Sequence, residues 1–301
     1  MTLAKEFAVF NRFYAAMPGP SQPNHMFAQS GTSCGTTETG VTYWSCGGLL
    51  PLFPQKTIYD SLSKAGKNFS IFYNDTPGDI YITSVLEKAL SHAHKYNAKG
   101  RGFYDAAAEG TLPELSWIVP RYGGPHPNDD HPCHDVALGE LLLKEVYESL
   151  RAGPKWNETA LLVVYDDPGG FFDHHGPPVS APPPEADCNK VRDKMRFAVK
   201  EKTKLTETSF VCARRCAPPL TPLQHNSGCP DKFAFDRLGM RLAALLVSPL
   251  VPKGTVIHDP VGPAADSKYE LTSIAATVKN LFGLPNFLTK RDAWAGDLSV
   301  S

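Results

Sequence analysis

Short, uninterrupted apolar runs constrain the fold of this chain more than any other feature of its sequence. Residues 160–165 (ALLVVY) are all apolar, and residues 242–247 (LAALLV) have the same character. Each run is too short for a helix of typical length and suits a β-strand that is covered on both faces. Because helical patterns alternate with these runs, we expect an α/β fold with a parallel or mixed sheet.

Capping and turn residues locate the other elements. The predicted elements are a helix at 57–62 capped by Thr57, strands at 69–73 and 115–119, a helix from Asp135 to about Leu150, and a final helix at 274–282. No internal repeat is present. We therefore expect one domain over residues 1–301, interrupted by an insertion at about 179–231.

The composition excludes several classes of protein. Thirty basic and 31 acidic side chains among 301 residues give a formal net charge of -1, which argues against a dedicated nucleic-acid binder. No apolar run approaches the length of a membrane span. The first residues carry charges without a following apolar stretch, so they do not predict a signal peptide. We expect a soluble or peripheral membrane protein.

The expected insertion differs in composition from the rest of the chain. It is rich in proline and holds four of the seven cysteines, and residues 190–204 carry seven basic and two acidic side chains. Val191, Met195 and Ala198 fall on one face of a helix there, which is a pattern of interfacial helices. This stretch is either a peripheral contact with anionic membranes or a solvated surface element.

Residues 166–175 (DDPGGFFDHH) are the most informative polar segment. Asp166 and Asp167 come directly after an apolar run, and ligands of open α/β sheets bind beyond the carboxyl ends of the strands. Paired carboxylates can hold a divalent metal ion, and Gly169 and Gly170 would let a ligand approach the backbone closely. A plain Asp-rich turn explains the same residues equally well.

Residues 128–135 (NDDHPCHD) place three carboxylates and two imidazoles before a predicted helix. His131 and His134 could bind a metal, contact a phosphate or protonate a leaving group, and Asp130 could contact the substrate. The alternative is a solvated loop in which Asp135 caps the helix.

Residues 29–37 (QSGTSCGTT) form a hydroxyl-rich run after the apolar residues 26–28. Those apolar residues suggest a strand that could carry a hydroxyl nucleophile such as Thr32 to the edge of a sheet. By composition alone, the run is more typical of a loop. Cys34 is a weaker candidate nucleophile, since a lone cysteine is more often buried and inert.

Together these segments resemble the phosphoesterase family that contains non-specific phospholipases C and a related acid phosphatase. The resemblance extends nearly from end to end of the chain. Further segments that carry it are residues 5–10, 18–24, 147–158, 237–239, 254–258 and 290–296.

The resemblance implies an alkaline-phosphatase-like α/β sandwich with a central, mostly parallel sheet flanked by helices. It also implies hydrolysis of phosphoesters, most simply phospholipid cleavage to diacylglycerol and a phosphorylated headgroup. By the same resemblance, Thr32 matches the hydroxyl nucleophile, Asp166 and Asp167 match ligands of a divalent metal ion, and a histidine of the His131 to Asp135 segment contacts phosphate and protonates the leaving group.

The chain also departs from the family pattern. It contains no copy of the family's early Glu-Asn-Arg-Ser-Phe-Asp-His motif, so it looks shortened at the amino terminus relative to the family. Pro168 and Leu271 stand where the family has histidines. These departures leave an alternative, a catalytically weak or inactive remnant that binds phosphate or lipid headgroups without turnover. They also lead us to expect weak metal binding and very low activity.

Overall fold

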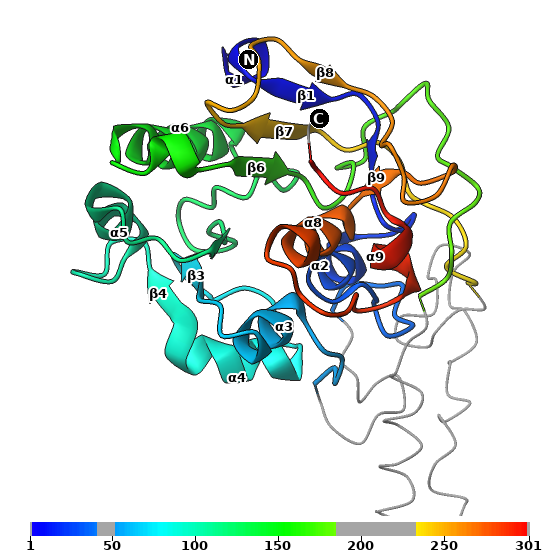
Figure 1. Ribbon diagram of the computed structural model, residues 1–301, viewed down its shortest axis with the longest axis horizontal. Coiled ribbons are helices and arrows are strands. Elements are labelled where there is room, and N and C mark those ends of the chain that lie inside the picture. Colours follow the sequence, from blue (N-terminus) through cyan, green and yellow to red (C-terminus); the bar gives the residue numbers. More distant parts are fainter. Residues whose placement is uncertain (1, 41–51, 185–232, 300–301) are drawn as a thin grey trace, which may run out of the picture.

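The computed structural model describes residues 2–40, 52–184 and 233–299, and Figure 1 shows their arrangement. In chain order the elements are α1 (Thr2–Glu6), β1 (Ala8–Phe10), β2 (Phe13–Tyr14), α2 (Ser21–Ser30), α3 (Ile58–Lys64), β3 (Phe69–Tyr73), α4 (Thr83–His92), β4 (Ala93–Lys95), α5 (Phe103–Glu109), β5 (Leu115–Ile118), α6 (Val136–Ala152), the 3-10 helix η1 (Trp156–Glu158), β6 (Leu161–Val164), β7 (Ala244–Val247), β8 (Val256–Ile257), β9 (Tyr269–Glu270), α8 (Ser273–Leu281) and α9 (Lys290–Trp294). None of the helices in these ranges is long and apolar enough to cross a membrane.

The described strands form three sheets. The largest has the order β6-β7-β1-β8, in which β7 is antiparallel to both β6 and β1, and β1 is parallel to β8. The sheet β4-β3-β5 is parallel throughout, and β2 and β9 form a short parallel pair. Parallel strands connected through helices confirm the α/β class predicted from the sequence.

Most predicted elements lie where the sequence places them. The helix α3 begins after Thr57, whose side chain forms a capping box with Asp60. The side chain of Asp135 accepts a hydrogen bond of 3.0 Å from the backbone N–H of Ala137, which caps α6 as predicted. Strands β3, β5 and β7 and helix α8 also confirm the predicted positions. The basic stretch 190–204 and most of the predicted insertion lie outside the described residues.

The prediction of a strand at residues 26–28 is wrong, because these residues belong to the helix α2. Phe27 and Ala28 pack in the core cluster that includes β1 and β7, whereas Met26 packs in another cluster with α3 and β3. A helix that is buried between two clusters carries consecutive apolar residues, and periodicity cannot then distinguish it from a strand. Figure 1 shows α2 beside α8.

The strand β6 is also less buried than its apolar sequence predicts. All four of its residues are half-buried, whereas β7 has three buried residues out of four. The difference arises because β6 lies at the edge of its sheet and has β7 as its only strand neighbour among the described residues. This edge strand leads directly into Asp166 and Asp167.

Arg291 of α9 joins distant parts of the chain in the interior. Its guanidinium donates hydrogen bonds to the carbonyl oxygens of Ala16 at 2.9 Å, of Pro182 at 2.7 Å and of Phe235. The side chain is fully buried and lies over the ring of Phe27. Since Pro182 and Phe235 flank the undescribed stretch 185–232, Arg291 fixes both ends of the described chain around it.

Candidate active site

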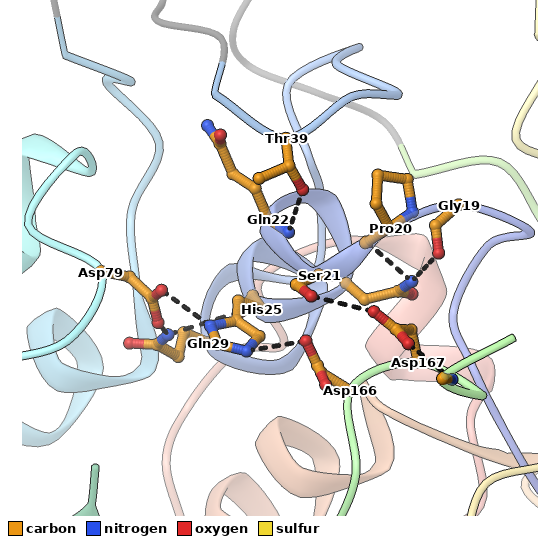
Figure 2. A network of polar contacts seen from close by, with 12 residues as sticks. Gly19, Pro20, Ser21, Gln22, His25, Gln29, Thr39, Asp79, Asp166 and Asp167 are labelled. Carbon is orange, nitrogen blue, oxygen red and sulfur yellow. Dashed lines mark hydrogen bonds and ion pairs between the residues drawn. The ribbon is translucent and has the colours of Figure 1, made fainter. Parts of the chain in front are cut away.

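The centre of the candidate site is His25, which lies between two carboxylates. Its Nδ1 atom is 2.8 Å from Oδ1 of Asp79, and its Nε2 atom is 3.0 Å from Oδ2 of Asp166 (Figure 2). The histidine comes from α2, Asp79 from the loop after β3, and Asp166 from the end of β6. Burial alone would lower the pKa of His25, but the carboxylates of Asp79 and Asp166 outweigh it and raise the pKa well above its usual value. His25 is therefore a cation that donates to both carboxylates.

Asp79 is held by three side chains. In addition to His25, it accepts hydrogen bonds from Nε2 of Gln29 and, at 2.7 Å, from the hydroxyl of Tyr81. His25 and Gln29 are one helical turn apart, so both reach the same carboxylate from one face of α2. Burial would raise the pKa of Asp79, but the charge of His25 and these hydrogen bonds lower it. The ionised Asp79 thus fixes the ring of His25.

Asp166 and Asp167 lie where β6 ends and face the amino-terminal half of α2 (Figure 2). Burial would raise the pKa of Asp166, but its hydrogen bond with His25 and the charge of that ring lower it to about 2. Asp167 accepts a hydrogen bond of 2.9 Å from the hydroxyl of Ser21 and one of 2.8 Å from the backbone N–H of Gly169. Gly169 and Gly170 both have positive φ angles, of 62° and 79°, as the tight turn requires.

The loop before α6 meets the same strand end. The hydroxyl of Tyr165, which directly precedes Asp166, donates a hydrogen bond of 2.6 Å to Oδ2 of Asp130. In this loop Nδ1 of His134 lies 2.6 Å from Oδ1 of Asp129. The exposed ring of His131 lies beside that of His134, with 5.7 Å between the ring centroids. The structure therefore brings together two segments that the sequence analysis treated separately.

Tyr122 lies beside the His25–Asp79 pair. Its ring centroid lies 6.4 Å from that of His25. Burial raises the pKa of Tyr122 above its usual value, and the negative charges of Asp79, Asp166 and Asp129 raise it further. A phenol that stays protonated near three carboxylates can donate a hydrogen bond to a phosphate oxygen.

Thr32 lies just beyond the carboxyl end of α2. The helix ends at Ser30, and Gly31 takes a left-handed conformation that turns the chain before Thr32. Its side chain is only 3% exposed, and its hydroxyl oxygen accepts a hydrogen bond of 3.1 Å from the backbone N–H of Cys34. No hydrogen bond joins Thr32 to the carboxylates or histidines of the site in the described part of the chain. Cys34 is disulfide-bonded, so it is not a free thiol.

The chain matches the model of the Phosphoesterase family over residues 1–285. This chain is a member of the Phosphoesterase family. It is 41% identical to non-specific phospholipase C6 of Arabidopsis thaliana over 97% of this chain and 49% of that protein. It is 40% identical to non-specific phospholipase C1 of the same plant over 98% of this chain and 48% of that protein. The chain thus spans about half the length of these relatives.

More distant similarities extend over the same length of the chain. Phospholipase C B of Mycobacterium tuberculosis strain ATCC 25618 / H37Rv is 25% identical over 99% of this chain and 53% of that protein. Among solved structures, a protein in the alkaline phosphatase superfamily from Vibrio parahaemolyticus is 12% identical with a TM-score of 0.49. That similarity covers 97% of this chain and 62% of the other.

The carboxylates of the candidate site have the chemistry to bind a divalent cation, but they are too few to complete its coordination. Asp166 is ionised above a pKa of about 2, and carboxylate oxygens are ligands that hard cations prefer. Both Asp166 and Asp167 already accept hydrogen bonds within the protein. In residues 2–40, 52–184 and 233–299, no group of three or more His, Cys, Asp or Glu side chains could hold a metal ion. These residues supply at most two ligands.

Sequence analysis missed three residues at the centre of the site, namely His25, Asp79 and Tyr122. His25 and Gln29 show the four-residue spacing of a helix face, but the apolar residues 26–28 between them suggested a strand. Asp79 follows the parallel strand β3, and polar residues beyond such a strand are a signal for a ligand site in this fold class. That signal could have identified Asp79.

Proposed function

We propose that this member of the Phosphoesterase family hydrolyses phosphoester bonds in phospholipids, as a phospholipase C does. The observation that carries the proposal is the convergence of His25, Asp79 and Asp166 at the end of β6, where the loop that holds the Asp129–His134 pair also meets the strand. The names of the relatives that are 36–41% identical over nearly the whole chain support the choice of phospholipid as the substrate.

In this proposal Asp166 and Asp167 would hold a divalent cation. Such an ion would neutralise charge on the phosphate oxygens and favour ionisation of a nearby hydroxyl. The backbone at Gly170, where a Cβ atom would meet nothing within 4 Å, leaves space for the phosphate. The hydroxyl of Tyr165 keeps Asp130 turned toward the strand end. Held in this way, Asp130 would lie next to the bound substrate and contact it.

Thr32 is the proposed nucleophile because it matches the hydroxyl of the family pattern, although its side chain is buried and has no hydrogen bond to the histidines or carboxylates of the site among the described residues. Its hydroxyl loses a proton to solvent as its oxygen forms a bond to phosphorus. The bond from phosphorus to the diacylglycerol oxygen breaks, and that oxygen takes a proton from His134. Asp129 supports this role of His134 because its carboxylate, 2.6 Å from Nδ1, orients the ring. Water then attacks phosphorus and gives a proton to His134, while the bond from phosphorus to the Thr32 oxygen breaks. The phosphorylated headgroup leaves, and the Thr32 oxygen takes a proton from solvent. His131 lies beside His134 and would contact a phosphate oxygen. The N–H of Cys34 supports ionisation of Thr32 by donating to its oxygen.

Hydrolysis of p-nitrophenylphosphorylcholine by the full chain, with Mn²⁺, Ca²⁺, Mg²⁺ or Zn²⁺ added in turn, tests this proposal. We expect Thr32→Ala to lower kcat by about a thousandfold or more, because a missing nucleophile costs far more than a missing contact. Thr36→Ala is the matched control, since Thr36 is 2% exposed in the same loop.

Two results would count against the proposal in different ways. Near-wild-type turnover by Thr32→Ala would show that another group is the nucleophile. Absence of turnover with every cation, together with retained binding of phosphorylcholine, would favour a protein that binds headgroups without hydrolysis. The small number of metal ligands among the described residues is the observation that favours this second candidate.

A further inference from the structure

Two adjacent aromatic side chains project into solvent beside the candidate site. Phe171 is 80% exposed and Phe172 is 92% exposed. Neither ring belongs to a core cluster or contacts another aromatic ring in the described part of the chain. Exposed apolar side chains are ordinary when they are single, but an adjacent pair of large rings next to a ligand site calls for a partner.

The turn that carries these rings is held at both ends. Before it, Asp167 accepts hydrogen bonds from Ser21 and from the backbone of Gly169, and the N–H of Phe171 donates to the carbonyl of Pro168 at 3.1 Å. After it, two nitrogens of Arg241 each donate to a carboxylate oxygen of Asp173 at 2.7 Å. The backbone on both sides is therefore fixed, and the rings are exposed because the turn points them outward.

We propose that Phe171 and Phe172 insert into the headgroup boundary of a phospholipid bilayer. This inference rests on the proposed function, since it names the surface from which the site would take its substrate. Phe171 follows Asp167 by four residues, so the two cannot be more than about 14 Å apart. Interfacial elements enter a bilayer by roughly 5–10 Å, so inserted rings would bring Asp167 close to the level of the lipid phosphates.

The size of the patch favours a bilayer over a protein partner. A phenylalanine side chain buries about 150–250 Å² when it is covered, so the two rings offer on the order of 300–500 Å². A stable protein interface needs about 800 Å² on each partner. A bilayer has no such threshold, because its binding strength grows with each apolar group that is inserted.

Co-sedimentation with phosphatidylcholine vesicles, measured with a chelator so that no lipid is hydrolysed, tests the proposal. We expect the Phe171→Ala/Phe172→Ala variant to partition at least about tenfold more weakly than wild type. The matched control is Leu90→Ala/Val261→Ala, which removes side chains that are 88% and 100% exposed elsewhere, and should partition like wild type. Partition of the wild type should change little between low and high salt, because zwitterionic lipid and apolar contact leave little charge to screen.

Three results would overturn the proposal. In the first, wild type and the phenylalanine variant bind the vesicles equally. In the second, the control variant loses as much vesicle binding as the phenylalanine variant. In the third, the wild type self-associates and the phenylalanine variant does not. The third would assign the rings to a second copy of this chain. Vesicle binding is measured without turnover, so it tests this proposal even if the protein does not hydrolyse phosphoesters.

Discussion

The cluster around Arg291 and the cluster around His25 both bury charged groups, yet they shift carboxyl pKa values in opposite directions. Burial raises the pKa values of Glu270 and Asp292, which lie near Arg291, although charges and hydrogen bonds oppose the shift. At Asp79 and Asp166 burial acts in the same sense, but His25 outweighs it and lowers both pKa values.

The difference lies in where the positive charge is directed. The guanidinium of Arg291 donates to three backbone carbonyls, so it ties chain segments together and is closed to solvent. The ring of His25 donates to two carboxylates, and the side chains of His25 and Asp166 remain 24% and 30% exposed. The first cluster therefore stabilises the fold, whereas the second keeps ionised groups within reach of a ligand.

Removal of Arg291 should have the largest effect on stability. We expect Arg291→Met to lower the free energy of unfolding by about 3–5 kcal/mol, because it leaves buried carbonyl groups without donors. Urea denaturation measures the loss. The matched control is Arg237→Met, since Arg237 is exposed and should change stability by less than about 0.5 kcal/mol. Similar values for both variants would show that the Arg291 cluster does not hold the fold.

A smaller loss is expected where α6 meets the loop of the site. A Cβ atom at Gly139 would lie 2.0 Å from Oδ1 of Asp130, so Gly139→Ala should displace the loop and cost about 1–3 kcal/mol. Thermal unfolding measures this cost, and NMR spectra of the histidine side chains report the displacement at His134. Gly176→Ala, where a Cβ would meet nothing within 4 Å, is the control. An unchanged melting temperature in Gly139→Ala would contradict the close packing described here.

The opposite pKa shifts predict opposite pH responses of stability. The pKa of Glu270 is raised in the folded protein. The contribution of Glu270 to the free energy of unfolding is therefore fully present below its ordinary pKa, and it is lost as the pH rises through the raised value. Glu270→Gln should therefore gain stability relative to wild type as pH increases from 4 to 8. Urea denaturation across this range measures the trend, and a difference that does not change with pH would contradict it.

Asp166 should respond in the other direction. Its pKa falls from 3.8 to about 2 in the folded protein. The contribution of Asp166 to the free energy of unfolding is therefore present above pH 3.8 and is lost as the pH falls toward 2. With a chelator present, Asp166→Asn should be less stable than wild type at pH 6, and the gap should close in acid. The same denaturation series measures this, and a gap that widens in acid would exclude the ion pair with His25.

The sequence predicts local features of the site well. The cap at Asp135, the strand before Asp166 and the turn at Gly169 depend on neighbouring residues, so short patterns are sufficient to find them. The resemblance to phosphoesterases likewise rests on short motifs, and the family membership confirms it. Asp129 and His134 were found within one polar segment for the same reason.

The contacts of His25 could not be predicted in this way. They join α2 to a loop 54 residues later and to a strand end near residue 166, so they depend on how three elements pack. The apolar residues of α2 hide its helical period because two core clusters cover the helix. The half-burial of β6 likewise depends on its edge position, which its own apolar sequence does not reveal.

Calorimetric titration of Mn²⁺ into the full chain tests the central claim most directly, because it measures the carboxylate pair without requiring turnover. We expect weak binding of one ion by wild type, and a loss of at least about tenfold in affinity in Asp166→Asn/Asp167→Asn, since the pair supplies the charged ligands. Glu148→Gln/Glu158→Gln removes the same charge from exposed side chains and should bind like wild type. Equal binding by wild type and the aspartate variant would contradict a cation site at the end of β6.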